Sequence, residues 1–177
     1  VTDSGLQSEA PGAEYITATG GTITTTGDFK IHTFTGPGTF TVCSVGNPAG
    51  SNTVDYMVIA GGGGGGPSGP CKGGGGGGAG GYRESSGTAS GSYTIGLPSQ
   101  NCAVSALPVS AQGYPIVVGS GGALRVVGSN SSFSTIASAG GGSNPGNCNA
   151  GTAGGSGGGA GKGTFSAAAG NTPLTTP

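Results

Sequence analysis

The sequence has little charge, a single histidine and no tryptophan. Charged residues make up 6% of the chain and the formal net charge is −1. Its five basic residues are scattered, so they form no patch that could neutralise several phosphates, and we expect no nucleic-acid partner. No apolar run approaches the roughly 18 residues that a membrane helix needs, so we expect no membrane insertion.

The residue groupings that catalysis or cofactor binding requires are also missing. His32 has no cysteine or aspartate arranged around it, which indicates a structural or solvent-facing residue. The acidic residues are scattered, and the nearest pair in sequence, Glu9 with Glu14, lies in an unpatterned segment, so a glycosidase-like pair is not expected. Lys162 lies between glycines but lacks the serine or threonine of a phosphate-binding loop. We therefore expect no enzymatic activity, no cofactor and no metal site.

What the chain has is glycine: 45 of its 177 residues, with uninterrupted runs at 61–66 and 73–78. A flexible linker is one interpretation of such runs. An ordered run must instead find partners for its N–H and C=O groups outside itself. Pairing at the edge of a sheet would supply these partners. Extended helices with three residues per turn that lie side by side would also supply them, and only glycine lets such helices come close enough.

The energetics of ordering decide what else such a run needs. Fixing a backbone residue costs roughly 1–2 kcal/mol, and glycine costs about 0.5–1 kcal/mol more than alanine. A hydrogen bond returns roughly 0.5–1.5 kcal/mol. Strands between the runs, disulfides or neighbouring copies of the chain must therefore supply the surplus. The fold class we predict is mainly β, with short antiparallel strands and hairpins combined with packed polyglycine-II-type tracts and almost no α-helix.

Turn residues and β-branched segments predict where the strands lie. Segments 22–26, 29–35 and 39–45 are separated by glycine-containing turns and predict a β-meander. The apolar run 54–60 predicts a strand buried on both faces. Further strands are expected at 92–95, 114–118, 124–127 and 132–137, with the last two paired across 128–130.

A strand runs into glycine three times, near residues 60, 119 and 139. We interpret this as a loose internal repeat in which the strands hold the tracts in register. The domain organisation that follows is an extended lead-in or linker over 1–20, a glycine-rich β/polyglycine domain over 21–169 and an extended Pro/Thr tail over 170–177.

The cysteines are even in number and widely spaced, at Cys43, Cys71, Cys102 and Cys148. With no C-x-x-C pair and one histidine, a disulfide framework in an oxidising setting is favoured over a zinc site and over four reduced, buried thiols. All three connectivities are open. We favour Cys71 with Cys148, because both interrupt glycine tracts, which leaves Cys43 with Cys102.

Aromatic and charged residues near the tracts have two interpretations. Tyr82, Tyr93 and Tyr114 could stack on sugars, but we favour packing over the edges of glycine tracts, where a ring covers exposed backbone. Asp55 and Arg83 flank the central stretch, and we expect them to form a stabilising pair.

Several motifs in one order carry a resemblance to a known family. Residues 27–42, then 54–60 with the following glycines, then 79–85, resemble the glycine-rich domain of tail-fibre and virion structural proteins from marine tailed phages. The later segments that fit the same order are 107–112, 114–119, 131–133 and 170–173. The resemblance covers nearly the whole chain from about residue 15.

The resemblance implies a fibre or adhesin component of a virion tail appendage, in which glycine tracts pack as polyglycine helices and the loops that join them touch the host receptor. The partner would be a host surface glycan or an outer-membrane protein. By this analogy the contacting turns are 67–72 and 143–149, with candidate residues Ser68, Lys72, Asn144, Asn147 and Asn149.

A second hypothesis is a self-assembling extracellular filament subunit, held by glycine-tract packing between copies. Symmetry separates the two hypotheses. A closed trimer is typical of a fibre tip, whereas an open helical repeat is typical of a filament.

Overall fold

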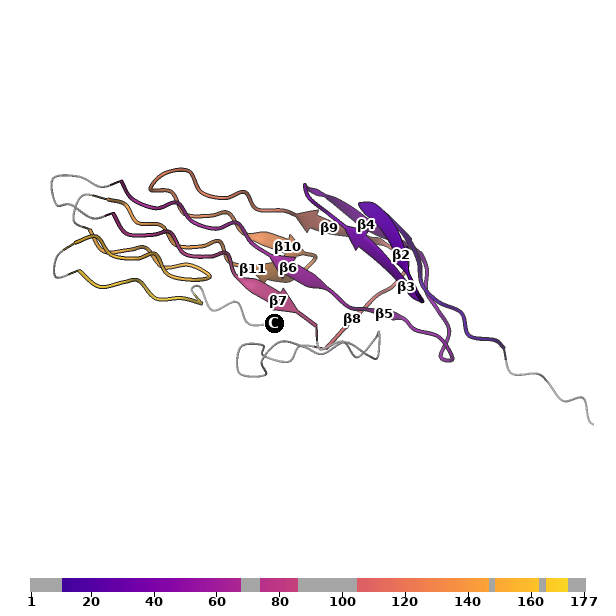
Figure 1. Cartoon of the computed structure of the whole chain (residues 1–177). Coiled ribbons are helices and arrows are strands. Elements are labelled where there is room, and N and C mark those ends of the chain that lie inside the picture. The colour runs from indigo at the N-terminus through magenta and orange to yellow at the C-terminus, as the bar shows by residue number, and fades with distance from the viewer. Residues whose placement is uncertain (1–10, 68–73, 86–104, 147–148, 163–164, 172–177) are drawn as a thin grey trace, which may run out of the picture.

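The structure is a computed structural model, and it describes residues 11–67, 74–85, 105–146, 149–162 and 165–171. Strands gather at one end of the molecule, and long extended segments run side by side from there to the other end (Figure 1). Within the described ranges the chain forms strands, turns and extended segments but no helix, so the predicted mainly β fold class is confirmed.

The strands are short and all of their pairings are antiparallel. They are β1 (Thr17–Thr19), β2 (Thr22–Thr26), β3 (Phe29–Thr33), β4 (Gly38–Ser44), β5 (Thr53–Val54), β6 (Met57–Ile59), β7 (Tyr82–Glu84), β8 (Leu107–Pro108), β9 (Gly113–Val117), β10 (Ser131–Phe133) and β11 (Ile136–Ser138). The largest sheet has five strands in the order β1-β4-β9-β10-β11, and the two-stranded sheets are β2-β3, β5-β8 and β6-β7.

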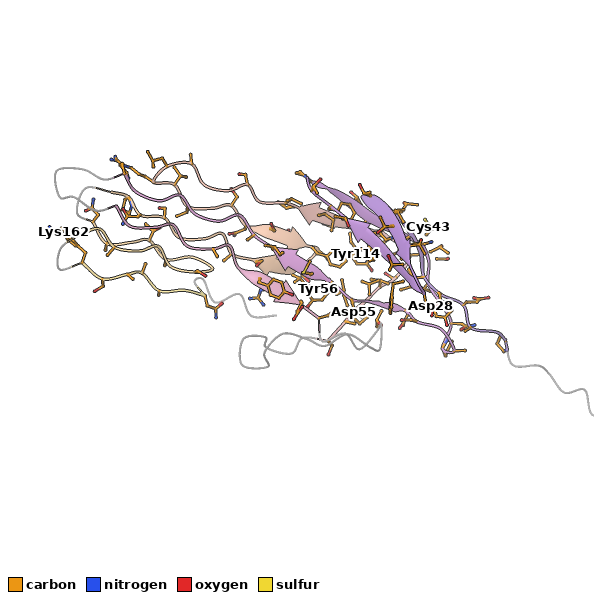
Figure 2. All side chains as sticks on the ribbon, viewed as in Figure 1. Asp28, Cys43, Asp55, Tyr56, Tyr114 and Lys162 are labelled. Carbon is orange, nitrogen blue, oxygen red and sulfur yellow. The ribbon has the colours of Figure 1, made fainter. Side chains whose placement is uncertain are left out.

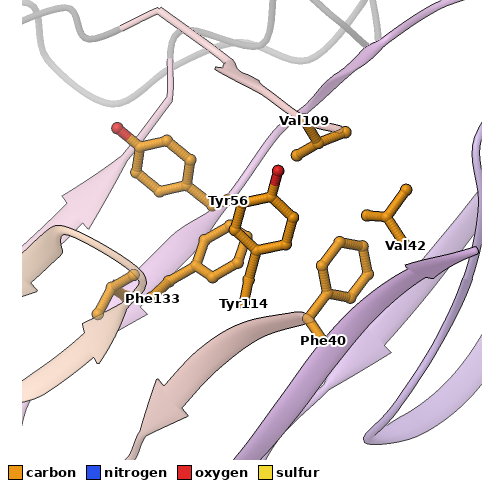
Figure 3. Close-up of a cluster of buried hydrophobic side chains, with 7 residues drawn as sticks. Phe40, Val42, Tyr56, Val109, Tyr114 and Phe133 are labelled. Carbon is orange, nitrogen blue, oxygen red and sulfur yellow. The ribbon is translucent and has the colours of Figure 1, made fainter. Parts of the chain in front are cut away.

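Pairing of β4 with β9 places the aromatic residues that build the core. Phe40 lies opposite Tyr114 in this register, and both side chains are buried. The ring of Phe133 on β10 lies 5.8 Å from the ring of Phe40 and 6.1 Å from that of Tyr114. Figure 3 shows the cluster, which is completed by Val42, Tyr56, Val58 and Val109. Edge-to-face ring contacts of this kind add to the free energy gained by burying the rings.

Polar groups at the rim of this core are bonded. The backbone N–H of Ser110 donates to the Tyr114 hydroxyl at 2.8 Å, and the Ser110 side chain lies 3.4 Å from the same oxygen. These hydrogen bonds lower the pKa of Tyr114. Nδ1 of His32 bonds the carbonyl of Gly20 at 2.8 Å, and its ring makes an edge-to-face contact with Phe40, so His32 has a structural place in the fold.

The predicted β-meander is only half right. β2 and β3 form the expected hairpin, but β4 leaves it and pairs with β1 and β9 instead. β1 also lies within the segment 1–20, which was expected to be an extended lead-in or linker. The cause is burial: Phe40 and Val42 face the aromatic core on the β9 side, whereas every residue of β2 is exposed.

Two further strand predictions were wrong. The segment 54–60 is not one strand buried on both faces, because it divides into β5 and β6, and Met57 and Ile59 of β6 are exposed. Segment 124–127 forms no hairpin with 132–137: it turns between glycine tracts, and β10 pairs with β11 instead. The strand expected at 92–95 lies outside the described residues.

Candidate functional site

Extended tracts of the chain fill the end of the molecule opposite the core. In chain order we number them tract 1 (60–66), tract 2 (74–81), tract 3 (119–123), tract 4 (125–130), tract 5 (139–146), tract 6 (149–155), tract 7 (156–162) and tract 8 (168–171). Tracts 1, 3 and 5 continue from β6, β9 and β11, so the predicted strand-then-glycine pattern is confirmed. Few side chains project from this bundle (Figure 2).

Hydrogen bonds of tract 1 repeat every third residue. Its N–H groups at Ala60, Gly63 and Gly66 donate to the carbonyls of Gly81, Gly78 and Gly75 in tract 2. The N–H groups one residue further on, at Gly61 and Gly64, donate to tract 4. The carbonyls of these same two residues accept from tract 5. A three-residue period is the signature of an extended helix with three residues per turn, so the tracts are polyglycine-II-type helices bonded across to one another.

Tract 5 lies inside the bundle and has the most neighbours. Its backbone bonds tracts 1, 2, 4, 6 and 7, running parallel to tract 1 and antiparallel to tract 2. Residues 139–144 are all buried. The interior of this end of the molecule is therefore made of main chain, where a globular domain would have side chains.

Close approach explains why tract 5 needs glycine. A Cβ added to Gly140 would lie 1.9 Å from the carbonyl oxygen of Gly128. At Gly141 it would lie 2.1 Å from the oxygen of Gly78, and at Gly142 1.9 Å from that of Thr152. Three consecutive residues thus face three different tracts, and none has room for a methyl group.

Two side chains bond backbone N–H groups near the start of tracts 3 and 5. The N–H of Gly140 donates to Oδ1 of Asn130 at 2.8 Å, and the N–H of Gly119 donates to Oγ of Ser131 at 2.9 Å. Sequence reasoning missed these residues. The sequence feature that could have identified them is the residue type, because asparagine and serine readily bond nearby backbone groups.

The far end of the bundle brings several tract ends together. The N–H of Asn149 bonds the carbonyl of Gly146, and the N–H of Gly161 bonds the carbonyl of Asn149. Arg125 joins them: a Cβ added to Gly146 would lie 2.9 Å from Nε of Arg125 and 3.2 Å from Pro67. Lys162 also lies at this end (Figure 2). We call this group of residues the tip.

Arg125 adopts a left-handed conformation, with φ of 67°. It donates its N–H to Gly65, and its carbonyl accepts from Oγ of Ser143 at 3.1 Å. The sequence had placed Arg125 in a strand. An arginine with positive φ is uncommon, and here the bonds to tracts 1 and 5 hold it.

The structure separates the predicted contact residues. Asn149 is exposed at the tip. Asn144 is fully buried, because Nδ2 donates to the carbonyl of Gly159 at 2.5 Å and Oδ1 accepts from the N–H of Gly146 at 2.8 Å. Its side chain therefore joins two tracts inside the bundle instead of facing outward. Ser68, Lys72 and Asn147 lie outside the described residues.

The cysteine and tyrosine predictions have mixed outcomes. Cys43 is a free, exposed thiol on β4, so the structure does not contain the favoured bond to Cys102. Cys102, Cys71 and Cys148 lie outside the described residues, as does Tyr93. Tyr114 packs in the core and not over tract edges, because its ring faces Phe40 and Phe133. Tyr82 is exposed on β7 and its hydroxyl donates to Glu84.

Asp55 lies next to the β6-β7 pair and takes part in a polar cluster. Its carboxylate accepts a hydrogen bond from Oγ of Ser85 at 2.6 Å. Oγ of Ser85 in turn accepts a hydrogen bond from the N–H of Tyr56 at 3.1 Å. Ser85 is fully buried. The cluster ties the start of β6 to the end of β7, at the base of tracts 1 and 2.

Residues 33–175 match the model of a family described as a glycine-rich domain. The chain belongs to the glycine-rich domain family. Neither curated proteins nor solved structures gave a match. In the described part of this glycine-rich domain, no helix is long and apolar enough to cross a membrane. Nor does that part group three or more histidine, cysteine or acidic residues where they could hold a metal ion.

Proposed function

We propose that this glycine-rich domain is a non-enzymatic structural and adhesive component of a phage virion appendage, a tail fibre or fibre tip, and that it contacts the host cell surface with its tip. The observation that supports the proposal is the separation of the molecule into two poles. Side chains make a core at one pole, and tract ends meet at the other, where Asn149, Arg125 and Lys162 are exposed or partly exposed.

The bundle suits display of a recognition surface. Each tract is bonded along its length by neighbouring backbone, and these bonds are independent of the residues in the turns. Turn residues can therefore change without disturbing the tracts, and this is the arrangement that a binding surface on a rigid scaffold requires. The phage assignment comes from the sequence resemblance, and the polyglycine bundle agrees with it.

The test is binding of the labelled domain to a panel of bacterial cells. We expect saturable binding that is lost when Asn149 and Lys162, both exposed at the tip, are replaced together by alanine. Gly76→Ala, on the side of tract 2, is the control and should bind normally, because an added Cβ there meets nothing within 4 Å. Protease treatment of the cells separates an outer-membrane protein from a glycan. Unchanged binding by the double variant would contradict contact through the tip.

A second candidate function is the self-assembling extracellular filament subunit. One observation favours it: tracts at the outside of the bundle keep rows of N–H and C=O groups that bond nothing within the described residues. Such rows are a template for another extended chain, as the open edge of a sheet is.

A further inference from the structure

The edge between tracts 1 and 2 is an unfinished part of the bundle. A helix with three residues per turn points its N–H groups in three directions around the helix axis and its C=O groups in three other directions. In tract 1 the carbonyls of Gly61 and Gly64 accept from tract 5, and those of Gly62 and Gly65 accept from Gly122 and Arg125. The remaining carbonyl row, on Ala60, Gly63 and Gly66, has no hydrogen-bond donor in the described part of the chain.

Tract 2 carries a complementary row beside it. Its carbonyls at Gly75, Gly78 and Gly81 accept from tract 1, and those at Gly76 and Ala79 accept from tract 7. The N–H groups of Gly74, Gly77 and Gly80 have no acceptor among the described residues.

The two rows lie residue against residue. A Cβ added to Gly80, Gly77 or Gly74 would come within 1.9–2.0 Å of the carbonyl oxygen of Ala60, Gly63 or Gly66, respectively. In the three-residue geometry, the free N–H groups of tract 2 and the free carbonyls of tract 1 therefore open toward the same side. We call this pair of rows the 1/2 edge.

Glycine at one position of the 1/2 edge, Gly62, is not required by the packing of this chain. A Cβ on Gly62 would meet only ordinary contacts, the nearest at 3.6 Å to the oxygen of Gly78. On Gly65 the Cβ would lie 3.3 Å from the oxygen of Gly75, a tighter contact that a small shift of the neighbour could relieve. Both Cβ directions point between tracts 1 and 2, into the space that the free rows face. Because glycine carries no side chain, another backbone has room to come close at Gly62.

We propose that the 1/2 edge binds a glycine tract from a second copy of this chain. An occupant must donate to carbonyls and accept from N–H groups that both recur every third residue, about every 9 Å. It must also lack side chains where it crosses Gly62 and Gly65. A polyglycine-II-type tract meets both conditions, and tract 5 already makes the same bonds to tracts 1 and 2 from the inner side. A formal net charge of −1 gives little repulsion between copies.

This inference rests on the second candidate function, the filament subunit, and identifies the surface through which two copies bind each other. The test is sedimentation velocity of the purified chain over a range of concentrations, with three proteins compared. Wild type should associate. Gly62→Ala should weaken association by about tenfold or more, because its methyl group fills the space that the incoming backbone occupies. Gly76→Ala is the matched control and should associate as wild type does, because Gly76 belongs to neither free row of the 1/2 edge and its Cβ meets nothing within 4 Å.

Two further measurements separate a loss of association from a loss of folding. Amide hydrogen exchange at Gly77 and Gly80 should slow as wild type associates, and thermal melting should show that Gly62→Ala folds as wild type does. A chain that stays monomeric at every concentration overturns a second copy as the occupant and removes the filament function, but it leaves tip adhesion standing. Association that Gly62→Ala leaves unchanged, with no added protection at Gly77, overturns the 1/2 edge alone.

Discussion

The strand end and the bundle end of this glycine-rich domain are stabilised by different groups. In the strand end, seven buried side chains pack together, among them the rings of Phe40, Tyr114 and Phe133. In the bundle, N–H and C=O groups of neighbouring tracts bond one another across interiors that contain almost no side chains. The strand end is therefore sensitive to the loss of a side chain, and the bundle is sensitive to the gain of one.

The largest effect should follow removal of a core ring. Phe133→Ala leaves a cavity between Phe40, Tyr56 and Tyr114, and we expect a loss of about 3–5 kcal/mol in the free energy of unfolding. Urea denaturation measures it. Phe165, which is 44% exposed, is the control, and its replacement by alanine should cost far less. Equal losses for the two variants would show that the cluster is not a core.

A single added methyl group should damage the bundle nearly as much. In Gly141→Ala the new Cβ meets backbone atoms of tracts 1 and 2, and we expect a loss of about 3 kcal/mol. The same change at Gly121, where the nearest atom is 3.7 Å away, is the matched control. Calorimetric melting of both variants compares them directly. Similar melting temperatures would contradict the packed interior of tract 5.

Loss of a buried amide should have an intermediate effect. Asn144→Ala removes the side-chain bonds to Gly159 and Gly146 and leaves their backbone groups unsatisfied, at a cost of about 2 kcal/mol. Asn149→Ala removes one bond at the surface, from Nδ2 to the carbonyl of Gly146, and should cost about 1 kcal/mol or less, because water can replace it. Chemical denaturation of the two variants would sharpen the distinction between a joint within the bundle and a residue on the tip.

The smallest effect should be a gain. Gly76→Ala places its Cβ in open space, so the variant keeps its native contacts while its unfolded chain loses freedom. We expect it to be more stable by about 0.4–1 kcal/mol. Gly77→Ala, one residue away, should instead be destabilised, because its Cβ would lie 2.0 Å from the carbonyl oxygen of Gly63. Thermal melting of the pair tests the three-residue period at single-residue resolution.

Sequence reasoning predicted the fold class and the entry of three strands into glycine tracts because both depend on local signals. Apolar and β-branched residues mark strands, and long glycine runs permit only a few ordered arrangements. It did not predict which tracts are neighbours, because a glycine has no side chain to distinguish one face of a tract from another. That information comes from strand pairing, such as β6 with β7, which places tract 1 against tract 2.

The errors at particular residues have the same origin. Asn144 is a polar residue in a predicted turn, and only the spatial arrangement of tracts 1, 5 and 7 shows that it is enclosed. Arg125 and its valine neighbours have strand-forming composition, but the turn that they make is set by bonds to tracts on either side. The pairing of β4 with β9 was not predicted because β9 lies far away from β4 in sequence.

The enclosed peptide groups of tract 5 have a thermal consequence. Exposure of apolar surface raises the heat capacity on unfolding, whereas exposure of polar surface lowers it. A region whose interior is amide and carbonyl should therefore unfold with a heat-capacity change per residue well below the usual value of about 12–15 cal/mol/K. Its stability curve is correspondingly flat, so the bundle keeps its strength in cold water, where ordinary apolar cores weaken.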